Sequence, residues 1–274
     1  MSSPPTTRSA KPFLKWAGGK TQLLDAILAA LPETFGTYFE PFLGGGAVFF
    51  GLAPERAVLS DLNAELINAF VVVRDEPEGL IERLQAYEPS KEEFYRVREL
   101  RPEDLSPVDR AARTVYLNRT CFNGLYRVNR KGEFNVPYGG PRVGRDIVRA
   151  DQIRQANAAL QGHVIRHADY LEATSSAMAG DLVYLDPPYV PLGGYADFRR
   201  YTDDPFGVED HERLASEFAA LADRGVYVVL SNSDTPLTRE LYAHWNVRTL
   251  TAPRRVSGKT SGRQAVSELL VSNF

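Results

Sequence analysis

Short apolar runs that end in polar or turn-forming residues alternate with stretches of helical periodicity along most of this chain. The runs predict strands near residues 37–42, 56–61, 162–169, 182–186, 226–232 and 268–271. Apolar residues spaced three or four positions apart predict helices near 23–31, 64–84, 94–100 and 209–223. Strands that alternate with helices are typical of an α/β fold with a largely parallel sheet.

The run Leu-Val-Tyr-Leu-Asp-Pro-Pro-Tyr at 182–189 is the most informative stretch of the sequence. A proline cannot continue a central strand, so the strand must end at Asp186, before Pro187 and Pro188. Ligands of open α/β sheets collect beyond the carboxyl ends of the strands. A fixed carboxylate, the carbonyl of Pro187 and the ring of Tyr189 would together suit an exocyclic amine on a flat heterocycle. The alternative is a Pro-Pro turn that Asp186 caps.

Three further strand ends carry residues that suit a nucleoside. The first predicted strand leads into Gly44 and two more glycines, which allow a ligand close to the backbone, although the spacing is not the dinucleotide fingerprint. Asp61 ends the second strand, where an acid can bind a ribose diol or can cap the following helix. Asp169 and Tyr170 end the strand at 162–169, where an acid and a ring could meet an adenine.

Lys20 follows two glycines at the expected start of a helix. Backbone N–H groups and an ammonium at such a position suit an anion, for example the carboxylate of an amino-acid-like ligand. The simpler interpretation is a glycine turn that begins the helix.

The composition of the 274 residues, with 43% hydrophobic and 24% charged side chains, is that of an ordinary globular protein. The single cysteine excludes an internal disulfide and a cysteine-cluster metal site, which suits a reducing cytoplasm. No apolar run approaches the roughly 18 residues of a membrane span, and the first residues, which lack the apolar stretch of a signal peptide, are expected to form a flexible tail.

The charge of the chain is unevenly distributed. The net charge is −3, yet residues 110–154 hold ten basic and three acidic side chains, an excess of seven positive charges. Such an asymmetry favours a local polyanion footprint, although a solvated basic face is the alternative.

The basic segment includes a predicted β-hairpin. Its turn is expected at Asn129–Gly132, between short strands within residues 126–135. Arginine and asparagine side chains can read base edges, and an aromatic ring can fill the space left by an extruded base. The alternative is a ribbon that its aromatic residues pack onto the domain.

Two other segments carry expectations of their own. Residues 191–206 hold several aromatic side chains in a polar context, which predicts a mobile flap near the target base. Residues 254–263 form a predicted basic loop, whose cations either reach phosphates or keep the loop soluble.

The order of Lys-Trp-Ala-Gly-Gly-Lys at 15–20, Phe-Glu-Pro-Phe-Leu-Gly-Gly-Gly at 39–46, Ser-Asp-Leu-Asn at 60–63 and Asp-Pro-Pro-Tyr at 186–189 resembles the Dam family of DNA adenine N6 methyltransferases. The resemblance implies a Rossmann-like sheet flanked by helices, with S-adenosylmethionine as methyl donor, S-adenosylhomocysteine as product, and no metal. The implied catalytic residues are Asp186, Pro187, Pro188 and Tyr189. The implied cofactor-binding residues are Trp16, Lys20, Phe39, Glu40, Pro41, Phe42, Gly44, Asp61, Asp169, Tyr170 and Asp186.

The hairpin also resembles the target-recognition hairpin of that family. Phe122 would occupy the space vacated by the flipped adenine, and the favoured site is GATC. The implied DNA-binding residues are Arg119, Phe122, Asn123, Leu125, Arg127, Asn135 and Pro137. The sequence after Tyr138 departs from the family pattern, which leaves recognition of the outer base pair open.

The expected organisation is a catalytic domain at 1–63 and 153–274, interrupted by an inserted, mostly helical DNA-recognition subdomain at 64–152 that carries the hairpin. The expected partner is double-stranded DNA in the cytoplasm, at the nucleoid, and the enzyme is expected to be a monomer without membrane contact. Whether it partners a cognate restriction endonuclease stays open. Rival interpretations are methylation of RNA or of cytosine N4, methylation of a protein glutamine amide, and a catalytically silent DNA-binding subunit.

Overall fold

The computed structural model describes residues 10–129, 131–140, 146–190, 206–252 and 266–274. The expected tail at the start of the chain, the flap up to residue 205 and the basic loop at 254–263 lie outside the described residues. Within the described residues, no helix has the length and apolar character needed to cross a bilayer.

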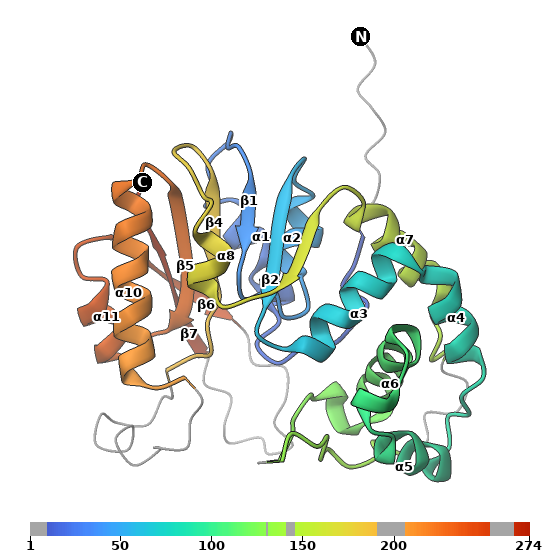
Figure 1. Ribbon diagram of the computed structural model, residues 1–274. Coiled ribbons are helices and arrows are strands. Elements are labelled where there is room, and N and C mark those ends of the chain that lie inside the picture. The colour runs from blue at the N-terminus through green and yellow to red at the C-terminus, as the bar shows by residue number, and fades with distance from the viewer. Residues whose placement is uncertain (1–9, 130, 141–145, 191–205, 253–265) are drawn as a thin grey trace. The chain divides into compact units, whose positions relative to one another are not determined.

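Helices and strands alternate through the chain except over residues 64–160, where only helices follow one another, and at the end, where the last two strands are consecutive (Figure 1). The α-helices are α1 Leu24–Leu28, α2 Ala47–Leu52, α3 Ala64–Asp75, α4 Pro77–Gln85, α5 Lys91–Glu99, α6 Pro107–Thr120, α7 Ala150–Leu160, α8 Tyr170–Thr174, α10 Val208–Asp223 and α11 Pro236–Leu241. Three short 3-10 helices are η1 Lys20–Gln22, η2 Pro102–Asp104 and η3 Phe122–Gly124. The strands are β1 Tyr38–Glu40, β2 Ala57–Asp61, β3 Val164–His167, β4 Leu182–Leu185, β5 Tyr227–Ser233, β6 Asn246–Ala252 and β7 Val266–Ser272.

The strands form one seven-stranded sheet in the order β3-β2-β1-β4-β5-β7-β6. The pairs β1–β2, β1–β4 and β4–β5 are parallel, whereas β7 runs antiparallel to both β5 and β6. The start of β7 therefore meets the carboxyl end of β5, where Glu268 pairs with Ser233. The α/β class predicted from the sequence is confirmed.

The chain divides into two compact units. The first comprises Met1–Gly19, Gly44–Ala53 and Asp61–His167, and the second comprises Lys20–Leu43, Pro54–Ser60 and Ala168–Phe274. The inserted subdomain with boundaries at residues 64 and 152 stays a prediction.

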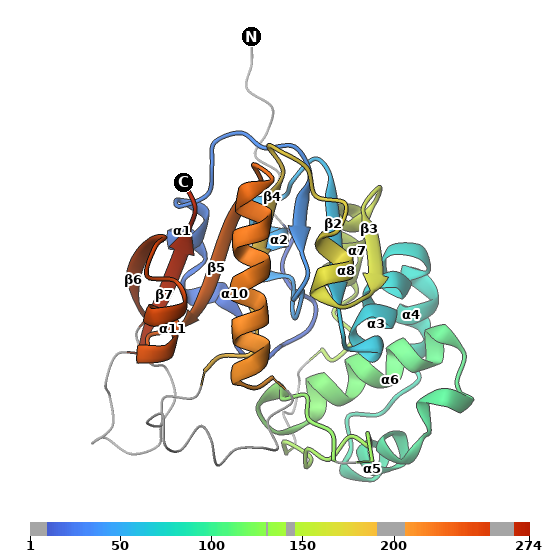
Figure 2. The ribbon, with the colours of Figure 1, turned by 60° about the vertical axis from the view of Figure 1, so that its left-hand side comes forward.

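The second unit has its core where α10 packs against the sheet. Figure 2 shows α10 along β5, and the side chains of Leu214 and Phe218 are fully buried there. All four residues of β4 are buried, as expected for a central strand that is covered on both faces. Tyr242 and Trp245 pack against the ring of Phe218, with centroid distances of 5.5 and 5.1 Å.

The first unit is mainly helical. Figure 1 shows α3 to α7 gathered together, with α6 packed against α3, α4 and α5. Serine side chains cap two of these helices, since Ser90 accepts a hydrogen bond from the Glu93 N–H and Ser106 one from the Asp109 N–H. The apolar side of α6 is buried, in keeping with a helix that has neighbours on several sides.

Two local expectations differ from the structure. The helix expected over 23–31 is only five residues long, because the chain after Leu28 continues in tighter turns, in which the Ala30 N–H bonds the Ile27 carbonyl and the Leu31 N–H bonds the Leu28 carbonyl. The hairpin has its turn at the expected place, where the Gly132 N–H donates to the Asn129 carbonyl at 2.9 Å. Its arms, however, pair through the isolated bridges Cys121–Tyr138 and Val128–Phe134 and not as two regular strands.

Phe218→Ala tests the packing of the second unit. Removing this buried ring is expected to lower the free energy of unfolding by about 3 kcal/mol, because the ring leaves a cavity between α10 and its neighbours. Chemical denaturation followed by circular dichroism measures the loss, with Glu212→Ala on the exposed side of the same helix as the control. A loss below about 1 kcal/mol would show that Phe218 is not central to this core.

Candidate active site

Asp186 lies directly beyond the end of β4. The strand ends at Leu185, and Pro187 and Pro188 then direct the chain away from the sheet, as the sequence predicts. The carboxyl end of the neighbouring strand β5 runs alongside, because Leu185 pairs with Leu230. This register places Ser231 beside Asp186.

Two donors contact the same oxygen of the Asp186 carboxylate. The Lys20 ammonium lies 2.8 Å from Oδ1, and the Ser231 hydroxyl donates a hydrogen bond to Oδ1 at 2.7 Å. Because both contacts are made by Oδ1, they leave the lone pairs of Oδ2 for another donor. The carboxyl group is therefore fixed in orientation and still able to accept a hydrogen bond.

A buried tyrosine fixes Ser231 in turn. The hydroxyls of Tyr184 and Ser231 lie 2.9 Å apart. Ser231 has one hydroxyl proton, which it donates to Asp186, so Tyr184 is the donor in this second bond. Asp186 is thus held by a chain of hydrogen bonds that begins inside the core.

Burial sets the protonation behaviour of Asp186. Removal from water raises the pKa of its carboxyl group above the ordinary value, while the charge of Lys20 and the hydrogen bonds from Lys20 and Ser231 act to lower the pKa. The charge of Glu268 also raises this pKa. Lys20 is therefore the main group that keeps the carboxylate ionised.

Tyr189 is held by the same cation and by a second acid. The Lys20 ammonium lies 4.6 Å from the centroid of the Tyr189 ring. The Tyr189 hydroxyl donates to Oε2 of Glu268 at 2.6 Å. Sequence reasoning missed both Ser231 and Glu268, because they lie 45 and 79 residues away from their partners.

The remaining second-unit residues predicted to bind the cofactor lie near the ends of β1 and β3. Phe39 and Pro41 are buried, and the buried Glu40 carboxylate accepts a hydrogen bond from Tyr38 at 2.8 Å. Phe42 is half-buried and stacks on Tyr170 at 5.4 Å, while the Arg213 guanidinium lies 5.3 Å from the same tyrosine ring.

Asp169 caps the short helix α8. Its carboxylate accepts a hydrogen bond from the Leu171 N–H at 2.9 Å and lies 3.5 Å from Arg213. The side chain stays about one-third exposed, so it retains acceptor capacity.

In the first unit, Asp61 holds the glycine-rich turn. Its carboxylate accepts hydrogen bonds from the N–H groups of Gly44 at 3.0 Å and Asn63 at 2.9 Å. Burial raises the pKa of Asp61, and these N–H donors act to lower it. The alternative role of Asp61 as helix cap belongs instead to Asn63, which accepts from the Leu66 N–H.

Both the backbone conformation at Gly44 and the space around it favour glycine at this position. Its φ is +49°, and a Cβ at this position would lie 3.0 Å from Cδ1 of Trp16. Trp16 also stacks on Tyr126 of the hairpin, with 5.0 Å between ring centroids. The segment that carries Trp16 is fixed to α6 by Asn118, whose amide bonds both the N–H and the carbonyl of Lys15. No pattern in the sequence predicts that role of Asn118.

The hairpin presents three apolar side chains to solvent. Phe122 is 51% exposed, Leu125 40% and Val128 41%, although each is a large apolar residue. The inner side is packed, since Phe134 is buried and lies edge-on to Tyr126. The packed inner side agrees with a ribbon held on the domain, and contact of the exposed side with DNA stays a prediction.

The other predicted DNA-binding residues of the hairpin are arranged around Arg127. Its Nε donates to the Asn135 side-chain oxygen at 2.7 Å, which sets the direction of the guanidinium. Asn123 and Pro137 are exposed, and the Pro137 carbonyl accepts from the Phe122 N–H at 2.9 Å.

Several arginines of the basic segment have partners inside the first unit. Arg119 donates to the carbonyls of Phe13, Ile147 and Val148, and burial lowers the pKa of its guanidinium to about 9. This geometry gives Arg119 a structural role. Arg110 pairs with Glu65 and Arg154 with Glu78, so acids outside the segment neutralise part of its excess charge.

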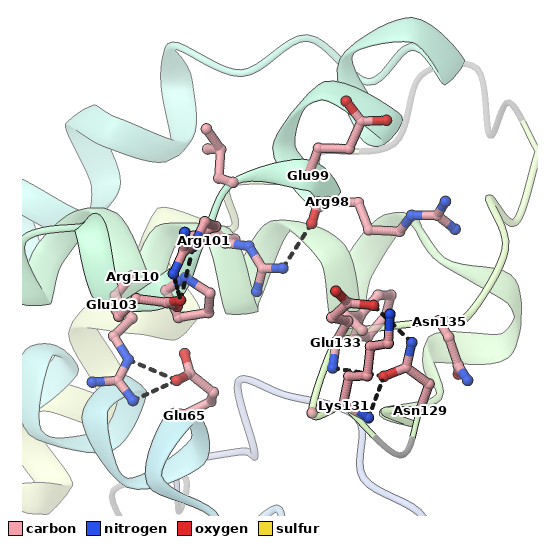
Figure 3. Close-up of a pocket in the computed structure, with 15 residues that line it drawn as sticks. Glu65, Arg98, Glu99, Arg101, Glu103, Arg110, Asn129, Lys131, Glu133 and Asn135 are labelled. Carbon is pink, nitrogen blue, oxygen red and sulfur yellow. Dashed lines mark hydrogen bonds and ion pairs between the residues drawn. The ribbon is translucent and has the colours of Figure 1, made fainter.

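A polar pocket of about 870 Å³ lies between the hairpin and the connection from α5 to α6 (Figure 3). Arg98 and Arg101 line it from one side, and Lys131 and Asn135 from the other. In Figure 3, Glu103 pairs with Arg101 and Glu133 bonds to Asn129, so acids share the walls. Within the described residues, no group of three or more His, Cys, Asp or Glu side chains could hold a metal ion.

The fold and the Asp-Pro-Pro-Tyr site are those expected of an enzyme that methylates an exocyclic amine. Residues 16–255 match the family model of D12 class N6 adenine-specific DNA methyltransferases. The chain belongs to this family, and it is therefore an adenine-specific DNA methyltransferase. Enzymes of the family generally use S-adenosylmethionine.

Curated relatives that are similar to this chain over nearly their whole length support the family assignment. The chain is 44% identical to type II methyltransferase M1.LlaDCHI of Lactococcus lactis subsp. cremoris, over 96% of this chain and 95% of the relative. It is 36% identical to a DNA adenine methylase of Serratia marcescens, over 94% of this chain and 96% of the relative. It is 34% identical to the DNA adenine methylase of Escherichia coli K12, over 94% of this chain and 93% of the relative.

Lys20→Met tests the electrostatics of the site. The variant removes the cation and hydrogen bond that lower the pKa of Asp186, so that pKa is expected to rise further. If methyl transfer needs the ionised carboxylate, the acidic limb of the pH–rate profile moves to higher pH. Single-turnover rates measured across pH test this expectation, with Lys11→Met at an exposed position as the control. An acidic limb that stays in place or moves to lower pH would contradict the role of Lys20 in keeping the Asp186 carboxylate ionised.

Proposed function

We propose that this enzyme transfers the methyl group of S-adenosylmethionine to N6 of an adenine extruded from duplex DNA, within the site GATC. The observation that carries the proposal is the carboxylate of Asp186 at the end of β4, whose contacts with Lys20 and Ser231 are both made by Oδ1 and do not use Oδ2.

Asp186 would act on the target amine directly. The N6 lone pair is delocalised into the adenine ring, so the amine is a weak nucleophile. Hydrogen bonds from N6 to Oδ2 of Asp186 and to the Pro187 carbonyl would favour a pyramidal nitrogen with a localised lone pair. Catalysis would then rest on positioning and electrostatics, without an enzyme nucleophile. The bound cofactor supplies a methyl group on a sulfonium centre.

The residues near the strand ends fit this cofactor by their chemistry. Asp61 is fixed by two backbone N–H groups and retains acceptor capacity for ribose hydroxyls. Asp169 is partly exposed and can accept from an exocyclic amine. We propose that the cofactor-binding residues are Trp16, Lys20, Phe39, Glu40, Pro41, Phe42, Gly44, Asp61, Asp169, Tyr170 and Asp186.

Extrusion of the adenine follows from the position of N6. An amine that is paired inside a duplex cannot reach a carboxylate at a strand end, so the base must leave the stack. Tyr189 would then stack on the extruded adenine. Phe122 is an exposed aromatic residue on a hairpin, and it would fill the space that the adenine leaves.

The hairpin would also read the flanking bases. Arg127, with its direction set by Asn135, is suited to bidentate contact with a guanine edge. Asn123, Leu125 and Pro137 would contact neighbouring positions. Arg119, whose guanidinium already donates to the carbonyls of Phe13, Ile147 and Val148, would hold these segments together and leave DNA contact to its neighbours.

The similarity to a protein named type II methyltransferase favours a role beside a restriction endonuclease. We therefore extend the proposal to a modification enzyme of such a pair, acting as a monomer on DNA at the nucleoid. An endonuclease that cuts the same unmethylated site would support this role.

Mapping of methylated adenines tests the proposed function. Plasmid DNA incubated with the enzyme and labelled cofactor is expected to carry N6-methyladenine at GATC alone. Asp186→Ala is expected to abolish transfer while duplex binding persists, because the hairpin is untouched. Methylation spread over unrelated adenines would contradict the site, and transfer by Asp186→Ala would remove this carboxylate from the mechanism.

Arg127→Ala tests the assignment of base recognition to the hairpin. The ratio of single-turnover rates on GATC and on sites with one flanking base pair changed is expected to fall by about tenfold. Cofactor affinity is expected to stay constant. Arg127→Lys keeps the charge but loses the planar fork, and it should behave like Arg127→Ala.

Arg248→Ala, at an exposed position on β6, is the control for general charge loss. Equal loss of rate on all sites by the Arg127 variants would mean that Arg127 contacts only the DNA backbone.

A further inference from the structure

Glu268 stands out among the polar groups around the Asp-Pro-Pro-Tyr segment, because it comes from the last strand of the chain. Its carboxylate is half-buried, and Oε2 accepts the hydroxyl proton of Tyr189 at 2.6 Å. A charge-assisted hydrogen bond of this length is stronger than one between neutral groups.

The topology explains how a residue so late in the chain reaches this place. Strand β7 runs antiparallel to β5, so its first residues lie at the edge of the sheet where β4 and β5 end. Glu268 pairs with Ser233 on one side and with Leu250 of β6 on the other. These two ladders fix the backbone of Glu268 and leave its side chain directed at Tyr189.

The Tyr189 ring is thereby fixed at two points. Lys20 lies over one face at 4.6 Å from the centroid, and Glu268 holds the hydroxyl. Because the ammonium covers one face, a base can stack only on the opposite face. A tyrosine without its hydroxyl contact could turn about its side-chain bonds, which would change the plane offered to the base.

We propose that Glu268 is a positioning residue, which orients the Tyr189 ring so that the ring receives the extruded adenine with N6 at Asp186. This inference rests on the proposed function, because it requires an extruded adenine that stacks on Tyr189. Glu268 does not contact the substrate. It acts through the hydroxyl of Tyr189.

The hydrogen bond between Tyr189 and Glu268 predicts coupled effects of their substitution. Tyr189→Phe keeps the ring and removes the donor, whereas Glu268→Ala removes the acceptor. Each is expected to lower the single-turnover rate of methyl transfer by about tenfold, the value expected for one hydrogen bond. The double variant is expected to be no slower than the slower single variant, because both changes remove the same contact.

Glu268→Gln tests whether the hydrogen bond to Tyr189 or the negative charge of Glu268 matters for the rate. A glutamine amide oxygen still accepts from the tyrosine hydroxyl. The rate of this variant is therefore expected to lie close to that of the unchanged enzyme. Glu212→Ala, which removes an exposed acid of the same unit, is the matched control.

Two readouts distinguish positioning from general damage to the fold. Binding of S-adenosylhomocysteine at full stoichiometry shows that each variant is folded. A fluorescent adenine analogue at the target position reports the base after extrusion, and its emission is expected to change in Glu268→Ala and Tyr189→Phe alike. Affinity for duplex DNA is expected to stay constant, so the effect appears in the rate and not in binding.

The outcomes are distinct for the two proposals. Additive losses in the double variant, or a Glu268→Gln variant as slow as Glu268→Ala, would overturn the positioning role while the proposed function stands. Failure of the unchanged enzyme to methylate adenine in duplex DNA would overturn both. Coupled losses with rescue by glutamine support the role of Glu268.

Discussion

The structure depends on how one carboxylate is held. Asp186 is kept in place by a cation and a hydroxyl that both contact Oδ1, and the hydroxyl is itself oriented by a buried tyrosine. A carboxylate in such surroundings tends to become protonated, because burial disfavours its charge. Lys20 opposes this tendency, so a single lysine both orients the acid and keeps it able to accept a hydrogen bond. The same ammonium lies over the Tyr189 ring, which links the acid and the aromatic residue of the motif.

The order of the strands explains why the site needs residues from the whole length of the second unit. Parallel strands β4 and β5 end at one edge, which brings Ser231 beside Asp186 although 45 residues separate them. The antiparallel strand β7 brings its first residues to that same edge and so supplies Glu268. A sheet of parallel strands alone would place the start of its last strand at the opposite edge.

The sequence predicted those features that depend on local chemistry. Pro187 prevents β4 from continuing, whatever the position of the strand in the sheet. The apolar stripe of α10 predicted the ends of this helix closely. Partners distant along the chain were not predictable. Ser231 is one polar residue at the end of a buried strand, and Glu268 is one acid at the start of another, so neither differs from an ordinary strand boundary. The basic segment shows the same difficulty, because Glu65 and Glu78 neutralise two of its arginines from helices outside it.

We propose that Oδ2 of Asp186 accepts a hydrogen bond from the target amine while Oδ1 stays bound to Lys20 and Ser231. The most direct test is a crystal structure of the enzyme with S-adenosylhomocysteine and a duplex that contains GATC. The proposed role of Asp186 predicts an extruded adenine with N6 within about 3.2 Å of Oδ2, and both contacts of Oδ1 unchanged. An adenine that remains stacked in the duplex, or an amine that lies beyond hydrogen-bonding distance of Asp186, would contradict it.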